Sequence, residues 1–201
     1  MNFLAHLYLS GNSNELKIGN FIGDAVKGKT YLDFPPEIKR GIILHRAIDT
    51  FTDKHEIVLE SKLRLRKCYG KHAGVVVDIF YDHFLSVDWQ KFSDVAISDF
   101  IKESYILLIQ NYFVLPGKVQ KYFPFMVVNN WLEKYGHVKG IERVLNGMSK
   151  YSSLPSSTKE GIEVFTSQYK LFRNDFNHFF PLLIDMVHKE YGVCFTKAGQ
   201  L

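Results

Sequence analysis

Nine acidic and imidazole side chains stand among apolar residues within the first 83 positions of this 201-residue chain. Burying a charge is costly unless the charge is paired or binds a metal ion. Any fold of this chain must therefore build a polar network from these groups or gather them around a metal. The nine residues are His6, Asp24, His45, Asp49, Asp53, His55, Asp78, Asp82 and His83.

Two pairs of these residues have a spacing that places both side chains on one face of a helix. His45 and Asp49 are four residues apart, as are Asp78 and Asp82. Asp49 falls in the last turn of its predicted helix, where the helix dipole disfavours a carboxylate. Asp78 and Asp82 repel each other if both are ionised, so either one is protonated or a cation lies between them. We therefore expect a positive group nearby: an arginine, a lysine or a metal ion.

A third carboxylate, Asp24, also falls near the end of a predicted helix. It follows Gly19 and Gly23, which are four residues apart and leave one helix face without side chains. A bare face allows close packing or close approach of a ligand. Three helices thus each place a carboxylate where a negative charge is unfavourable. We expect these carboxylates to lie close together in the folded protein.

Oxygen and imidazole donors without cysteine suit Mn²⁺, Mg²⁺, Fe²⁺ or Zn²⁺, and a carboxylate-rich set favours Mn²⁺ or Mg²⁺. Such an ion can activate water and bind a phosphoryl oxygen.

Interpretations that need no metal remain open for several of these residues. His6 fits an ordinary hydrogen-bonded core histidine equally well, and Asp53, three residues before Glu56, fits a helix N-cap better than a metal ligand. The pair Asp175 and His178 is interpreted as a surface pair.

Helical periodicity dominates the sequence and predicts a single all-α domain over residues 1–201 with about eight helices. The aromatic stripe of Phe172, Phe176, Phe179 and Phe180 is expected to be core. The helices are expected to start near residue 2 and then to cover about 14–28, 36–51, 53–68, 72–85, 93–113, 117–135, 137–149 and 158–190.

Composition narrows the class of protein. Two cysteines without metal-type spacing argue against a disulfide framework and favour a reducing compartment. The first residues lack a basic leader, and no apolar run reaches the roughly 18 residues that span a bilayer. We expect a cytoplasmic protein that binds no membrane. The net charge of +4 is mild and does not by itself imply nucleic acid.

Positive charge is concentrated in one stretch. From Lys62 to Lys71 the chain carries five lysines and arginines and no acid. The stretch is either a solvated helix face or a docking surface for an acidic partner.

Four stretches together have the pattern of a known family. They are MNFLAHL at 1–7, GNFIGD at 19–24, GIILHRAIDTFTDKH at 41–55 and VVDIFYDHFL at 76–85. In this order, and with this chain length, they closely resemble the acyl carrier protein phosphodiesterases, also called acyl carrier protein hydrolases.

The resemblance implies a fold similar to the all-helical, metal-dependent phosphohydrolases of the HD type. It implies a reaction that removes the 4′-phosphopantetheine arm from holo acyl carrier protein by hydrolysing the phosphodiester to a serine. Mn²⁺ is the implied metal, with Mg²⁺ or Fe²⁺ as alternatives. Acyl carrier proteins are acidic, so the stretch from Lys62 to Lys71 gains a partner, and complementary charge would mainly speed the encounter.

These considerations lead to a hypothesis for the site, with most residues within positions 1–90. Metal ligands are expected among Asp24, His45, Asp49, Asp78 and Asp82. Catalytic roles are expected for His6 or His83 as general acid and for Arg46, with Lys27, at the phosphate. Substrate-binding residues are Lys27, Lys62, Arg64 and Arg66. The alternatives are a metal phosphohydrolase acting on a nucleotide or small phosphoester, and a non-catalytic module that binds carrier proteins.

Overall fold

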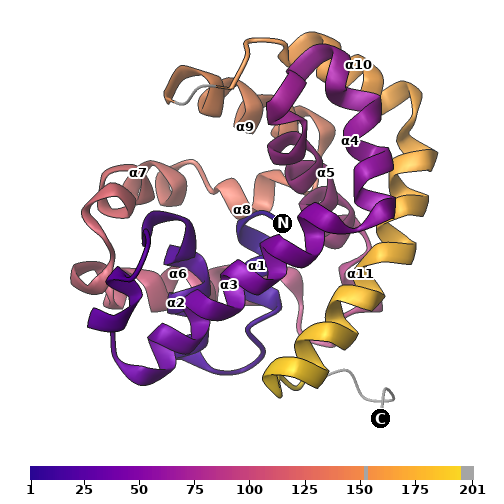
Figure 1. The fold of residues 1–201 in the computed structure, drawn as a ribbon. Coiled ribbons are helices and arrows are strands. Elements are labelled where there is room, and N and C mark those ends of the chain that lie inside the picture. The colour runs from indigo at the N-terminus through magenta and orange to yellow at the C-terminus, as the bar shows by residue number, and fades with distance from the viewer. Residues whose placement is uncertain (152–153, 196–201) are drawn as a thin grey trace.

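The computed structural model describes residues 1–151 and 154–195, and this part of the chain is all helical (Figure 1). It contains eleven α-helices and no strand, which confirms the all-α prediction. The helices are α1 (Phe3–Tyr8), α2 (Asn14–Ile22), α3 (Pro36–Lys54), α4 (Glu56–Tyr69), α5 (Ala73–Val87), α6 (Ile97–Gln110), α7 (Gly117–Val128), α8 (Trp131–Lys134), α9 (Val138–Tyr151), α10 (Thr158–Ser167) and α11 (Tyr169–Tyr191).

The number of helices exceeds the expected number because two long predicted helices are each divided. The helix expected at 117–135 is interrupted before α8, where Asn130 adopts a left-handed φ of 45°. Asparagine accepts this conformation more readily than most residues. The helix expected at 158–190 is divided at Gln168, which lies between α10 and α11.

The start of α4 also differs from the sequence prediction. Asp53 was expected to be its N-cap, but α3 continues through Lys54 and His55 occupies the cap position. The His55 Nδ1 accepts a hydrogen bond from the Ile57 N–H at 3.3 Å. The prediction for Asp53 is therefore wrong, and its carboxylate instead binds the Lys62 ammonium at 2.7 Å.

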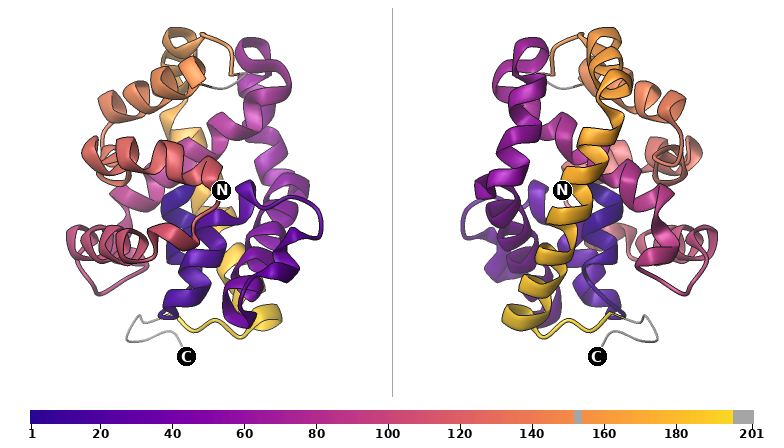
Figure 2. Two further views of the ribbon diagram at one scale, coloured as in Figure 1. Left: turned by 90° about the vertical axis from the view of Figure 1, so that its left-hand side faces the viewer. Right: turned by 90° about the vertical axis from the view of Figure 1, so that its right-hand side faces the viewer.

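Aromatic side chains of α5 and α11 form the centre of the core. The predicted stripe of phenylalanines on α11 is fully buried, which confirms that it is core. Phe176 packs against Tyr81 and Phe84 of α5, with ring centroids 5.7 and 5.9 Å apart. The helix α11 runs along one side of the molecule (Figure 2). The N-terminus lies near the middle of the molecule in both views. No helix in the described residues is long and apolar enough to cross a membrane.

Two glycines allow α2 and α3 to cross with their backbones in contact. A Cβ atom at Gly19 would lie 2.0 Å from the Ile38 carbonyl oxygen, and one at Gly41 would lie 2.5 Å from the Leu16 carbonyl oxygen. Gly23 leaves room for the His45 ring, since a Cβ there would lie 2.3 Å from the imidazole. The bare face expected around Gly19 and Gly23 thus serves close packing, and it brings α2 against the candidate site.

We predict that Gly19→Ala destabilises the protein by about 1–3 kcal/mol, because the added methyl group meets backbone atoms that cannot move aside. The matched control is Gly117→Ala, where a Cβ would meet nothing within 4 Å. Urea unfolding followed by circular dichroism measures both free energies of unfolding. Equal values for Gly19→Ala and the parent protein would contradict the close crossing.

Candidate metal centre

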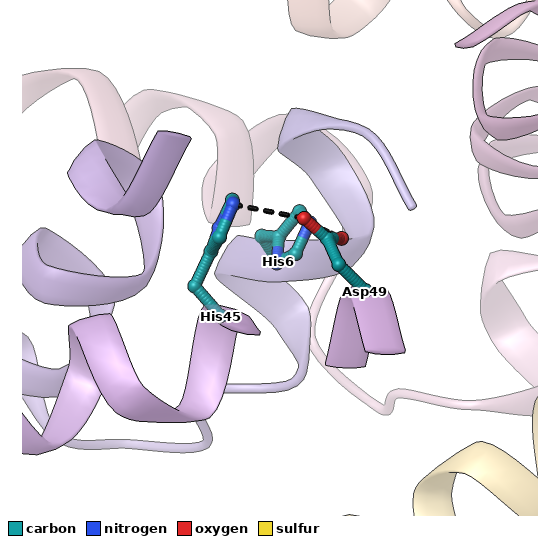
Figure 3. Close-up of side chains that lie close together, drawn as sticks. All are labelled: His6, His45 and Asp49. Atoms are coloured by element: carbon teal, nitrogen blue, oxygen red, sulfur yellow. Dashed lines mark ion pairs between the residues drawn. The ribbon is translucent and has the colours of Figure 1, made fainter. Parts of the chain in front are cut away.

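Two histidines and one aspartate from two helices form a compact group of donor atoms. His6 comes from α1, while His45 and Asp49 come from α3, and one donor atom of each lies within 4.8 Å of the others. The Asp49 carboxylate oxygens lie 3.2 Å from the His6 Nε2 and 3.1 Å from the His45 Nε2. The two imidazole rings stack with centroids 4.1 Å apart, and the side chains point toward one another (Figure 3). Both histidines are buried, while Asp49 is partly exposed.

The buried side chain of Asn20, in α2, fixes which nitrogen of His6 carries a proton. Its amide nitrogen donates to the His6 carbonyl at 2.8 Å and to the Ser10 hydroxyl at 2.9 Å. The amide oxygen is therefore free to accept from the His6 Nδ1 at 2.7 Å. The Asn20 backbone carbonyl accepts from the His45 Nδ1 at 2.7 Å in the same way. Both rings thus hold a proton on Nδ1 and direct Nε2 toward Asp49, which is how proteins commonly orient metal-binding histidines.

This arrangement leaves an electrostatic conflict at His6. Burial, together with the positive charge of His45, lowers the pKa of His6 to about 4, so the ring is neutral near pH 7. Its Nε2 lone pair then faces the Met1 carbonyl oxygen at 3.1 Å and the Asp49 carboxylate at 3.2 Å. Three electron-rich atoms that meet in a buried place repel one another unless a cation lies between them. The His45 Nε2 is likewise buried without a well-aligned hydrogen bond.

The other charges of the group follow from their neighbours. Burial alone would lower the pKa of His45, but Asp24 and Asp49 raise that pKa to about 9. Burial would raise the pKa of Asp49, yet the Met1 ammonium and the His45 imidazolium hold it well below its usual range. The neighbouring His45 imidazolium lowers the pKa of Asp24. Without a metal, the group is therefore an imidazolium flanked by two carboxylates.

Asp78, on α5, lies beside this group through the amine of Met1. The amine nitrogen is 3.1 Å from an Asp78 carboxylate oxygen and 3.5 Å from an Asp49 oxygen. Burial would lower the pKa of this amine, but Asp78 and Asp49 raise it to about 10. The ammonium therefore supplies one of the positive groups that the carboxylate spacing required.

Asp82, one turn further along α5, holds α1 in place. Its oxygens accept hydrogen bonds from the backbone N–H groups of Asn2, Leu4 and Ala5 at 3.3, 2.8 and 3.3 Å. These donors have no partner within α1, because a helix leaves its first N–H groups unpaired. Burial raises the pKa of Asp82 to about 7. Asp82 thus fixes the helix that carries His6, and metal binding by its carboxylate stays a prediction.

His83 and Arg46 are engaged with other parts of the protein. The His83 Nδ1 donates to the Tyr135 carbonyl at 2.6 Å, and its Nε2 lies 3.0 Å from the Tyr169 hydroxyl. The structure thus does not bring His83 into contact with the His6–His45–Asp49 group. Arg46 donates to the carbonyls of Val26 and Gly28 at 2.9 and 3.0 Å, so it ties down the loop after Asp24.

A surface hollow of about 420 Å³ opens onto the group between this loop and α3. Its lining includes Asp24, Lys27, His45, Arg46 and Asp49, which are all residues that the sequence nominated. The Asp24 side chain is 83% exposed, so it stands at the rim with its Oδ1 3.5 Å from the His45 Nε2. The hollow therefore gives solvent and a ligand access to an otherwise buried group.

The cations of α4 are less available than expected. Lys62 is paired with Asp53. Arg64 is paired with Asp175 of α11 and lies over the Phe172 ring at 5.4 Å. The interpretation of Asp175 as part of a surface pair is therefore wrong, because its carboxylate also accepts from the Ser61 hydroxyl at 2.7 Å. Of the three α4 residues predicted to bind substrate, Arg66 alone is exposed, whereas Lys62 and Arg64 are half-buried.

The sequence profile of the family described as acyl carrier protein phosphodiesterase matches residues 1–183. The chain belongs to this family. It is 29% identical to the acyl carrier protein phosphodiesterase of Yersinia enterocolitica over 185 residues, which cover 92% of this chain and 96% of the relative. The relative from Photorhabdus laumondii is 28% identical over 195 residues, with 96% and 98% covered. The relative from Klebsiella pneumoniae strain 342 is 29% identical over 194 residues, with 94% and 99% covered. No solved structure matches the chain.

Sequence reasoning on this phosphodiesterase family member missed two groups of the centre. Asn20 lies inside GNFIGD, one of the four family-like stretches. The available sequence signal was an amide side chain among apolar residues, and the structure shows that this side chain is buried. The amine of Met1 gave no sequence signal, because a sequence motif consists of side chains and the amine belongs to the backbone. Each has its effect through contacts between segments far apart in the sequence.

We predict that Asp82→Ala lowers the free energy of unfolding by about 1–3 kcal/mol, because buried N–H groups of α1 lose their acceptor. Asp33→Ala, which removes an exposed carboxylate in the segment before α3, is the control and should leave stability nearly unchanged. Urea unfolding of the metal-free proteins measures both. An unchanged midpoint for Asp82→Ala would show that this carboxylate does not anchor α1.

Proposed function

We propose that this chain is a metal-dependent phosphodiesterase that removes the 4′-phosphopantetheine arm from holo acyl carrier protein. Family membership over residues 1–183 supports the substrate and the bond that is broken. One observation supports the metal: the two imidazole Nε2 atoms, with their Nδ1 protons both held by Asn20, face the same carboxylate. A donor set with this orientation suits a divalent ion better than it suits a water molecule or a lysine.

His6, His45 and Asp49 would hold the ion, and Asp24 stands close enough to contribute from the rim. A mixture of imidazole and carboxylate donors suits Mn²⁺, with Mg²⁺ or Fe²⁺ as alternatives. When bound, the ion would supply Lewis acidity at a phosphate oxygen and lower the pKa of a water molecule. The likeness to the HD type belongs to this proposal, as does ligation by Asp78 or Asp82.

The remaining residues of the hollow would receive the phosphodiester. The Lys27 ammonium, at the mouth, can neutralise the phosphate charge. Arg46 contributes positive charge and keeps the loop of Val26 and Gly28 closed over one side of the hollow. His6 serves as a ligand in this arrangement rather than as the general acid. The proposal makes no use of His83, because both of its ring nitrogens have partners elsewhere.

We predict that Asp49→Ala lowers kcat/KM for holo carrier protein at least a hundredfold in the presence of Mn²⁺, because a ligand on which both imidazoles converge is lost. Mass spectrometry of the carrier measures the loss of the phosphopantetheine arm, and excess chelator should stop the reaction of the parent protein. Asp53→Ala, which removes an exposed ion pair on the same helix, is the matched control.

Full activity of Asp49→Ala would contradict the metal centre. Hydrolysis of small phosphoesters without any activity on carrier protein would favour the small-substrate alternative. Tight binding of carrier protein without metal uptake would favour a non-catalytic module.

We predict that metal binding releases about one proton near neutral pH, because His45, with a pKa of about 9, must lose its proton to become a ligand. His6, with a pKa of about 4, is already neutral and releases none. Metal affinity should therefore rise as the pH rises toward about 9. Calorimetry of Mn²⁺ binding in two buffers with different ionisation enthalpies counts the protons. Affinity independent of pH, with no proton released, would exclude His45 as a ligand.

A further inference from the structure

An apolar and basic strip on α7 lies on the outer side of the molecule, at the left of Figure 1. We define the α7 strip as Lys118, Lys121, Phe125 and Val128, whose spacing places them along one face of the helix. All four are exposed, and Phe125 and Val128 are exposed to 66% and 85%. Exposed apolar side chains that lie next to each other commonly mark a surface that binds another molecule.

The charged residues in the chain segment around the α7 strip are all positive. Residues 104–132 contain two lysines and no aspartate or glutamate. Among the described residues, neither Lys118 nor Lys121 takes part in an ion pair of this chain. The ammonium groups of these two lysines are therefore available to carboxylates of another molecule. The matching surface on a partner combines acidic groups with apolar side chains.

The helix that carries the α7 strip contacts the helix that carries His6, and this contact is made by Tyr122. This residue lies on the same helix, one position from Lys121 and three from Phe125. Its ring centroid is 6.0 Å from that of Phe3, which belongs to the helix that carries His6. Together with burial, the negative charge of Asp24 raises the pKa of Tyr122, which is consistent with Asp24 standing nearby. A macromolecule bound along the strip would therefore lie beside the exposed rim of the centre.

The basic stretch of α4 fits this purpose less well. Lys62 and Arg64 are held in ion pairs with Asp53 and Asp175, so a partner would have to break these contacts. Exposed ion pairs are weak, but Arg64 is also packed over Phe172. The α7 strip offers its cations without such competition.

We propose that the α7 strip is the docking surface for the acidic carrier protein, which places carboxylates on Lys118 and Lys121 and an apolar side chain against Phe125 and Val128. The inference rests on the proposed function for the identity of the partner. The phosphodiester of the carrier has to reach the hollow beside Asp24, and the strip lies on that side. Family membership favours a carrier protein over a membrane as the molecule bound to the strip.

The test compares three double variants. Lys121→Glu/Phe125→Ser alters the strip, Lys170→Glu/Leu171→Ser is the matched control on α11, and Arg66→Glu/Lys67→Glu alters the α4 stretch; all six parent side chains are exposed. Calorimetry measures the affinity for apo carrier protein, which lacks the arm, and kinetics with holo carrier protein give KM and kcat. Mn²⁺ affinity and the thermal unfolding midpoint report whether the centre and the fold are intact.

We expect the strip variant to bind the carrier more weakly and to have a KM raised at least tenfold. Its kcat and Mn²⁺ affinity should change little. Carrier binding should depend more strongly on salt concentration in the parent protein than in this variant. The control on α11 should match the parent. Unchanged carrier binding by the strip variant would overturn the inference, as would a loss confined to the α4 variant.

If the strip variant instead loses sedimentation with anionic vesicles or self-association, while carrier binding persists, the occupant is a membrane or a second copy. Carrier binding through the strip without any turnover by the parent protein would refute the proposed function and leave the docking surface standing.

Discussion

The contact on which the candidate centre depends is made by one residue, Asn20. Its side chain and its backbone carbonyl each accept the Nδ1 proton of an imidazole, and these imidazoles come from different helices. The direction of the amide is set in turn by the two acceptors that its NH₂ group reaches. The result is a pair of buried imidazoles whose Nε2 atoms are aimed at one carboxylate. The close crossing of α2 and α3 at Gly19 and Gly41 makes this geometry possible, because a longer distance between the helices would leave His45 out of reach.

The centre combines a rigid side with an open side. On the rigid side, α5 fixes α1 through Asp82 and neighbours the Met1 amine through Asp78. On the open side, Asp24 and Lys27 stand at the rim of a hollow that solvent can enter. Charge balance connects the two sides: the carboxylates near the centre exceed the fixed cations once His6 is neutral. Such a surplus of negative charge favours a divalent cation or a bound proton, and Asp24 and Asp49 raise the pKa of His45 accordingly.

The sequence was sufficient to predict the all-α fold, the shared face of His45 and Asp49, and the need for a cation near Asp78. These features follow from local periodicity and from the cost of burying charge. It was not sufficient to identify Asp82 as the anchor of α1, because that role depends on two segments about 80 positions apart. The Arg64–Asp175 pair was missed for the same reason. The predicted Asp53 cap failed because α3 continues to Lys54, three residues further than expected, and His55 fills the cap position instead.

The most direct measurement is anomalous diffraction from crystals grown with Mn²⁺, recorded at the manganese absorption edge. The account predicts one strong peak within coordination distance of the His6 Nε2, the His45 Nε2 and the Asp49 carboxylate. A peak bound elsewhere, or an empty site with His45 still paired to Asp49 at saturating Mn²⁺, would contradict it.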